Sequence, residues 1–279
     1  MRIAVTGASG AIGRAIVEMA LDQGHSVVGI DRVAPATASA TGDISFVQAD
    51  MSEYDRLVEA FAGCDGLIHM AAIPSPGRHP DHIVHNNNVV GSYNALRAAA
   101  ENGIMQICQA SSVNAIGHAF SRHPRYDNFP LDESHANYSE EPYSLSKWIC
   151  EEQGESFARR YEDMTIASMR FHLVVPERAD AINIYSRNGQ SPEHHLWAWT
   201  GRASAADACL KSLEAAFTGH EAFYIVGPDT TETTPSQTLA VQHFPKVPIT
   251  GDLSGNRSFF SSAKAERMLG WRHGEAKLT

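Results

Sequence analysis

Cysteines are scarce in this sequence of 279 residues. The four that are present, Cys64, Cys108, Cys150 and Cys209, lie far apart, and no two of them have the Cys-x-x-Cys spacing of a redox or zinc site. Nothing in the sequence indicates a secretory context that would favour disulfides. We therefore expect reduced, buried thiols rather than a disulfide framework.

Long apolar runs and clusters of basic residues are also missing. No window approaches the roughly 18 consecutive apolar residues of a membrane span, and the chain begins with a strand pattern instead of a charged leader. We expect a soluble, cytoplasmic protein with no membrane partner. The formal charge is −10, and the 22 basic residues form no cluster, so the field would repel a phosphate backbone. Nucleic acid is therefore not an expected partner.

A metal-binding motif is absent despite the 14 histidines. The HExxH motif and its relatives do not occur, and His194 and His195 are adjacent, which on a helix would point their rings about 100° apart. We expect no catalytic metal.

Short apolar runs alternate with helical patterns over the first 110 residues. This alternation is typical of βαβ units and of a parallel sheet. It continues through a helical pattern from about Tyr143 to Tyr161 and a strand pattern from Ile166 to Phe171. We predict an α/β fold with a doubly wound parallel sheet. The first five apolar runs lie at residues 3–5, 27–30, 44–47, 67–70 and 104–108.

The regular alternation ends after Phe171. A polar stretch covers residues 176–192, and only one further helix, near 203–217, and one further strand, near 223–226, are indicated. We predict a first domain at residues 1–171. Residues 172–279 are expected to form a small, irregular C-terminal substrate cap, with some elements returning to the core of the first domain.

The turn after the first expected strand is rich in glycine. Residues 6–13 read TGASGAIG, a G-x-x-G-x-x-G loop that leads into the first helix. Glycine lets the backbone turn sharply and approach a pyrophosphate, whose charge is attracted by the N–H groups and dipole of the helix N-terminus. A purely structural turn is the alternative for the glycines alone. In this context we predict a Rossmann fold and a dinucleotide held by Gly7, Gly10, Ala11, Ile12 and Gly13.

The second expected strand ends at Asp31. A mononucleotide-binding unit places an acid at this point to hydrogen-bond the ribose hydroxyls, and that acid disfavours the 2′-phosphate of NADP. Arg32 follows directly and could pair with the same phosphate. The alternative for Asp31 is a solvated turn residue. We expect NAD as the cofactor, with NADP as the alternative.

Tyr143 and Lys147 stand four residues apart in the segment YSLSK, on the same face of a helix. The fifth expected strand runs out into Ser111 and Ser112 at its carboxyl end, where ligands bind in open α/β sheets. Moving a hydride from an alcohol carbon to nicotinamide requires a base for the hydroxyl proton, and the unperturbed tyrosine pKa of about 10 is too high. A nearby ammonium lowers that pKa, and a serine hydroxyl can hold the substrate oxygen.

We therefore predict Tyr143 as the general base or acid, Lys147 as the group that lowers its pKa, and Ser112 as the group that orients the substrate oxygen. The alternative is a helix with one surface tyrosine and a lysine that extends along it to solvent.

These segments together resemble the extended short-chain dehydrogenase/reductase family, which includes nucleotide-sugar epimerases, dehydratases and uronate dehydrogenases. The resemblance covers nearly the whole chain. It rests on TGASGAIG at 6–13, the acid Asp31, Asp50-Met51, HMAA at 69–72, Asn88-Val89-Val90-Gly91, SSVNAIG at 111–117, YSLSK at 143–147, and Lys264, Leu269, Gly270 and Trp271 near the C-terminus.

The resemblance implies further roles. Ser112 is selected over Ser111 because the family's serine stands five residues before the glycine that is Gly117 here. A homodimer is the default assembly, through the helix after Asn88 and the helix that carries Tyr143. The cofactor contacts that it implies are Asp50 and Met51 near the adenine, Ala71 and Ala72 against the ribose, Asn88 beside the catalytic group, and Tyr143 and Lys147 at the nicotinamide ribose.

The departures from the family concern the substrate. Sugar-nucleotide epimerases usually carry an arginine, two aromatic or apolar residues and then an asparagine after the sixth strand, whereas Arg170 here is followed by Phe171, His172 and Leu173. The chain is also shorter than is usual for those enzymes. Its length and serine segment look closer to uronate dehydrogenases, whose carboxylate-binding arginine would fall near His195.

The candidate substrate contacts are Ser75, Ser112, Asn114, Tyr143, His172 and His195, with Trp197 or Trp199 from the cap. Ordinary packing is the alternative for each of them. We predict an NAD(P)-dependent oxidoreductase acting on the CH–OH group of a small hydroxy or carbonyl substrate, a free sugar or sugar acid. The alternatives are a nucleotide-sugar epimerase or dehydratase with tightly bound NAD, and a non-catalytic NAD(P)-sensing regulatory protein.

Overall fold

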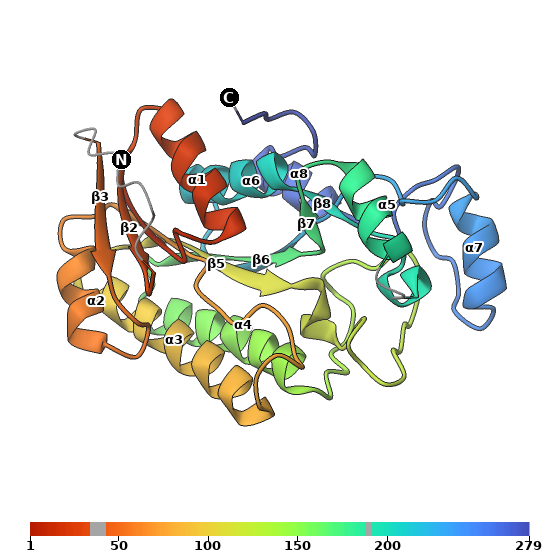
Figure 1. Ribbon diagram of the computed structural model, residues 1–279, viewed down its shortest axis with the longest axis horizontal. Coiled ribbons are helices and arrows are strands. Elements are labelled where there is room, and N and C mark those ends of the chain that lie inside the picture. The colour runs from red at the N-terminus through yellow and green to blue at the C-terminus, as the bar shows by residue number, and fades with distance from the viewer. Residues whose placement is uncertain (34–42, 188–190, 279) are drawn as a thin grey trace.

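The computed structural model describes residues 1–33, 43–187 and 191–278 (Figure 1). Within these ranges the centre of the molecule is one sheet of seven parallel strands in the order β3-β2-β1-β4-β5-β6-β9. This is the doubly wound α/β sheet expected from the alternating apolar runs. The strands are β1 (Arg2–Thr6), β2 (Ser26–Asp31), β3 (Ile44–Gln48), β4 (Gly66–His69), β5 (Gln106–Ser112), β6 (Thr165–Phe171) and β9 (Gly219–Ile225).

Helices cover both faces of the sheet (Figure 1). One face carries α1 (Ala11–Asp22), α6 (Arg202–Glu214) and α8 (Ala263–Leu269), and the other carries α2 (Tyr54–Phe61), α3 (Asp81–Glu101) and α4 (Pro142–Arg160). Because both faces are covered, the inner strands are apolar along most of their length, and β4 and β6 are buried throughout.

The strand order reverses between β1 and β4. From β1 the chain winds outward to β2 and β3, and from β4 it winds the other way to β5, β6 and β9. Such a reversal opens a crevice beyond the carboxyl ends of the strands. Gly7 follows β1 at this point and has a φ of +68°, and a Cβ on it would lie 2.8 Å from the amide nitrogen of Ala71 after β4. Both the backbone angle and the close approach require glycine.

The C-terminal part of the chain contributes to the sheet as well as to a cap. α6 packs against α1, and β9 pairs with the full length of β6, from Thr165 opposite Gly219 to Phe171 opposite Ile225. Figure 1 shows α5 and α7 beyond the end of the sheet, where they form the cap. The boundary at residue 171 stays a prediction. The cap elements are β7 (Val174–Val175), α5 (Arg178–Arg187), the 3₁₀ turn η2 (Pro192–His195), β8 (Thr200–Gly201) and α7 (Ser236–His243).

The composition also led to expectations about the cysteines and about membrane-spanning segments. All four cysteines are buried and none is in a disulfide, which confirms the expected free thiols. In the ranges that the structure describes, no helix combines the length and apolar content that crossing a membrane requires.

Candidate active site

A cleft of about 690 Å³ lies at the carboxyl ends of β1, β4, β5 and β6. Its walls come from the glycine loop, the loop after β4, the 3₁₀ turn η1 (Val113–Ile116), the start of α4 and the segment after β6. Most of the site residues predicted from the sequence therefore face one space. Those that line it are Gly7, Gly10, Ala11, Ile12, Gly13, Ala72, Ser75, Ser112, Asn114, Tyr143, Lys147, His172 and His195.

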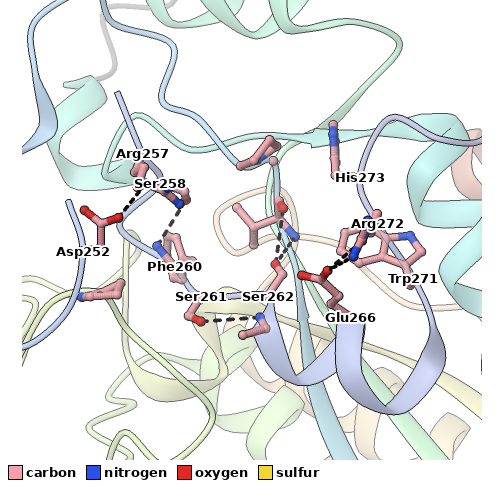
Figure 2. A pocket seen from close by; sticks show the side chains of 15 residues that line it. Asp252, Arg257, Ser258, Phe260, Ser261, Ser262, Glu266, Trp271, Arg272 and His273 are labelled. Atoms are coloured by element: carbon pink, nitrogen blue, oxygen red, sulfur yellow. Dashed lines mark hydrogen bonds and ion pairs between the residues drawn. The ribbon is translucent and has the colours of Figure 1, made fainter. Parts of the chain in front are cut away.

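A second pocket, of about 520 Å³, lies between the chain after β9 and the segment that leads into α8 (Figure 2). Its two arginines are already paired, Arg257 with Asp252 at 2.9 Å and Arg272 with Glu266 at 2.5 Å. None of the site residues predicted from the sequence lines it. The cleft at the strand reversal is therefore the candidate active site.

The glycine loop is shaped to receive a pyrophosphate. A Cβ on Gly13 would lie 2.1 Å from the carbonyl oxygen of Gly7, so α1 and the loop touch without side chains between them. α1 begins after Gly10, and no side chain caps it, which leaves its first N–H groups available to an anion. This open cradle fits the dinucleotide expected from the sequence.

Asp31 lies beside the same loop. Its carboxylate accepts hydrogen bonds from the backbone N–H groups of Ser9 at 3.0 Å and Val33 at 3.2 Å. Arg32 is exposed, and its Nε lies 3.9 Å from a carboxylate oxygen of Asp50. Hydrogen bonds from Ser52 are the main cause that lowers the pKa of Asp50. Asp31, Arg32 and Asp50 do not line the main cleft; they form a polar group beside the glycine loop.

Three of the residues that were expected to touch the cofactor have contacts within the protein. Met51 packs beneath Gly91, and the Ala71 N–H donates to a side-chain oxygen of β1 at 3.3 Å. The buried Asn88 amide bonds both backbone groups of Ile73 and the hydroxyl of Ser146, at 2.8 to 3.1 Å. None of the three lines the cleft. Their contacts with the cofactor stay predictions.

The predicted catalytic residues are held by the start of α4 and the end of β5. The Glu141 carboxylate caps α4 by accepting hydrogen bonds from the N–H groups of Tyr143 and Ser144, at 2.7 and 2.6 Å. Tyr143 and Ser112 line the same cleft, Ser112 acts to lower the pKa of the Tyr143 phenol, and the Ser112 Oγ accepts a hydrogen bond from the N–H of Asn114 at 3.1 Å. The structure thus brings Tyr143 and Ser112 together, as the sequence predicted.

Lys147 has a different contact from the one expected. Its Nζ donates to the carbonyl oxygen of Ala110 at 2.8 Å and lies 5.9 Å from the centre of the Tyr143 ring. Burial raises the pKa of Tyr143 to about 12, although Ser112 acts in the opposite direction. The expected lowering of this pKa by Lys147 is therefore absent from this arrangement, because burial of the phenol outweighs an ammonium that is bonded elsewhere.

Apolar side chains account for that burial. Tyr143 packs with Ile73 and Val84, and the Phe120 ring meets it edge to face at a centroid distance of 5.7 Å. Phe120 also lines the cleft. Phe120 could not be predicted from the sequence, because the segment between η1 and α4 has no periodic pattern.

A buried ion pair lies directly behind the catalytic residues. Glu151 accepts two hydrogen bonds from Arg170, at 2.9 and 2.7 Å, and one from the Ser111 hydroxyl at 2.5 Å. Burial alone would raise the pKa of Glu151, but Arg170 holds it below its usual value. The two serines therefore have different partners, since Ser111 bonds Glu151 whereas Ser112 bonds Asn114. In the sequence, Glu151 could have been found from its spacing, since it stands four residues after Lys147.

The substrate end of the cleft contains imidazole rings. His172 lies between His118 and His195, with ring centroids 5.8 Å apart on each side. Trp197 and Trp199 are both buried, 4% and 7% exposed, and neither lines the cleft. The suggestion that one of them contacts the substrate is therefore wrong, because both rings are used in packing the cap.

A model of the NAD dependent epimerase/dehydratase family matches residues 3–214. This chain belongs to that family. The match confirms the family resemblance seen in the motifs. It does not identify the substrate.

Individual relatives cover only part of the chain. L-arabinose 1-dehydrogenase (NAD(P)(+)) of Haloferax volcanii is 33% identical over 167 residues, which is 57% of this chain and 62% of that protein. The matched stretches make up between 12% and 62% of the length of the first curated relatives.

Solved structures confirm the fold over the whole chain. A mutated uronate dehydrogenase is 20% identical, with a TM-score of 0.71 over 99% of this chain and 82% of that chain. A UDP-glucose 4-epimerase of Stenotrophomonas maltophila, with bound NAD and formylated UDP-arabinopyranose, is 21% identical, with a TM-score of 0.73 over 98% and 93%. The Rossmann architecture expected from the sequence is thereby confirmed.

Proposed function

We propose that this protein is a dehydrogenase that transfers a hydride between NAD and a small hydroxy or carbonyl substrate, a free sugar or sugar acid. One observation carries the proposal: Tyr143, Ser112 and the open glycine loop line one cleft. The proton acceptor and the loop that would hold the dinucleotide therefore lie in one cleft, where both can act on the same substrate carbon. Lys147 completes the group.

In the oxidation direction, the substrate carbon loses a hydride and its hydroxyl loses a proton. When bound, NAD⁺ accepts the hydride, and its positive nicotinamide favours the ionised form of a nearby phenol. Ser112 holds the substrate oxygen, and Tyr143 takes the hydroxyl proton as the carbonyl forms and passes it to solvent. Lys147, held by the Ala110 carbonyl, adds a positive charge to the same surroundings.

Two features of the sequence support a free sugar over a nucleotide sugar. The chain is short for a sugar-nucleotide epimerase, and Leu173 stands where those enzymes usually carry an asparagine after the sixth strand. Ile184 of α5 also lines the cleft from the cap side.

The test is turnover of a panel of free sugars and sugar acids with NAD, followed by NADH absorbance, in the protein and in Tyr143→Phe. We expect the variant to lose at least about 10²-fold in kcat, the usual contribution of a positioned base, with nearly unchanged NAD affinity by calorimetry. Tyr161→Phe, at the other end of α4, is the matched control and should keep full activity. Retained turnover in Tyr143→Phe would refute the mechanism.

A nucleotide-sugar epimerase or dehydratase that returns the hydride to its substrate is the second candidate. The family model and the epimerase fold favour it. Product formation from a nucleotide sugar without net NADH would select it over the dehydrogenase.

We also propose a homodimer built on α3 and α4. These helices lie side by side on the outer face of the molecule (Figure 1). Large apolar side chains are exposed on them: Ile83, Val90 and Tyr93 on α3 at 43 to 48%, and Leu145 on α4 at 39%. A second copy of the same surface would cover them.

A further inference from the structure

The substrate end of the cleft is lined by neutral polar groups. These are the imidazoles of His172 and His195, the hydroxyls of Ser75 and Ser112, and the amide of Asn114. No aspartate or glutamate is among the described residues that line the cleft, and its cations are Lys147 and Arg78.

His172 is fixed as a neutral ring by its surroundings. Its Nδ1 accepts a hydrogen bond from the N–H of Leu173 at 2.7 Å, so the proton of the neutral ring stands on Nε2. His118 lies on one side of it and His195 on the other. Burial, together with the neighbouring His195, lowers the pKa of His172 well below its usual value. A positive charge here would face two further imidazoles and no carboxylate.

His195 is the ring that reaches the cleft from the cap. It is half-buried, and the Tyr185 ring supports it at a centroid distance of 5.3 Å. The next two residues, Leu196 and Trp197, have φ values of 48° and 51° and bury their side chains, which anchors the backbone beside it. Burial, with a contribution from the adjacent His194, lowers the pKa of His195 to about 4. His195 thus offers a neutral donor and acceptor.

Among the described residues, neither cation is a buried charge with a contact to the imidazoles. Lys147 is buried against the Ala110 carbonyl beside Tyr143. Arg78 is exposed on the loop between β4 and α3, at the mouth. A substrate carboxylate next to His195 would lose its hydration, and no buried positive charge would compensate for that loss. Such a transfer is costly in free energy. A hydroxyl both donates and accepts, and so matches imidazoles, serines and the unpartnered Oδ1 of Asn114.

We infer that this cleft selects an uncharged polyhydroxy substrate, a neutral free sugar, over the corresponding sugar acid, and that His195 is the residue that sets this preference. The inference rests on the proposed function and narrows its substrate class.

The test compares pairs that differ only in charge: D-galactose with D-galacturonate, and D-glucose with D-glucuronate. We expect kcat/KM with NAD to favour the neutral member of the better pair by at least about tenfold, equivalent to one charge-assisted hydrogen bond left unmade. A ratio of one or below for that pair overturns the inference. Because this ratio is measured on the wild-type protein, it tests the inference even if no variant folds.

Two variants that each add one positive charge then test the role of His195. His195→Arg places a cation at the cleft and should raise kcat/KM for the acid at least about tenfold relative to the neutral sugar. His194→Arg adds the same charge one residue away, at an exposed position that does not line the cleft, and should leave the ratio unchanged. If both variants shift the ratio equally, or neither does with both folded, His195 is not the determinant.

Calorimetry separates this inference from the proposed function. If no sugar of either class yields NADH while NAD still binds, the proposed function fails. Binding of the same sugar pairs to the NAD-loaded protein then judges the inference: tighter binding of the neutral members supports it, whereas equal binding, tighter binding of the acids or binding of neither overturns it. If NADH forms faster from the acids, the dehydrogenase stands and the inference alone fails.

Discussion

The buried pair of Glu151 and Arg170 gives a quantitative prediction for stability. Their side chains are 4% and 3% exposed, and two hydrogen bonds join them. Replacing Glu151 with leucine removes the carboxylate and leaves the guanidinium in the interior without its counter-charge. The Ser111 hydroxyl loses its acceptor in the same change.

The expected cost is about 3–5 kcal/mol of unfolding free energy, the range for breaking a buried ion pair from one side. Glu155→Leu is the matched control on the same helix. Glu155 is 44% exposed and pairs with Arg159 four residues later at 2.8 Å, so water screens the pair and its loss should cost at most about 1 kcal/mol. The contrast between the two variants follows from burial alone.

Urea unfolding followed by circular dichroism measures both costs, with the slope against urea checked for constancy. The double variant Glu151→Leu/Arg170→Met should be more stable than Glu151→Leu, because it removes the unpaired charge and replaces the pair with apolar side chains. The reasoning is refuted if Glu151→Leu costs no more than Glu155→Leu, or if the double variant is the less stable of the two.

Four further predictions concern the cofactor loop, cofactor choice, pH and assembly. Gly13→Ala should abolish NAD binding, because its Cβ would lie 2.1 Å from the Gly7 carbonyl oxygen; a folded variant with wild-type affinity by calorimetry contradicts this. Asp31→Ser should raise the NADP/NAD ratio of kcat/KM by at least about tenfold by removing a charge that repels the 2′-phosphate, and an unchanged ratio would place Asp31 away from the ribose. Because burial keeps the pKa of His172 low, the unfolded chain takes up a proton below about pH 6.5 that the folded chain refuses, and stability is lost as the pH falls. Between pH 6 and 5, wild-type stability should fall faster than that of His172→Gln by up to about 1.4 kcal/mol per pH unit, and parallel curves from urea unfolding would argue against it. Val90→Glu, at an exposed apolar position on α3, should turn a dimer into monomers in light scattering, and an unchanged dimer excludes this face.

Much of the fold and of the reacting group is visible in the sequence because both depend on local rules. Alternating apolar runs predicted the parallel sheet, since strands covered on both faces must be apolar. The glycine loop was recognisable because a φ of +68° at Gly7 and a 2.1 Å clearance at Gly13 exclude side chains. The spacing of Tyr143 and Lys147 fixes a shared helix face without reference to the rest of the chain.

The tertiary structure decided what surrounds that reacting group, because these contacts join segments far apart in sequence. The tertiary structure shows that β9 is the edge strand beside β6. It also shows that the Asn88 amide is hydrogen-bonded to Ile73 and Ser146, and that the Lys147 ammonium is hydrogen-bonded to a carbonyl. The pKa of Tyr143 is also decided by the tertiary structure, since it depends on burial among side chains from several elements. The sequence alone therefore predicts the fold, the family and the candidate residues of the reacting group. Packing alone decides which side chains meet beyond the end of β6, where the His172 ring lies between those of His118 and His195.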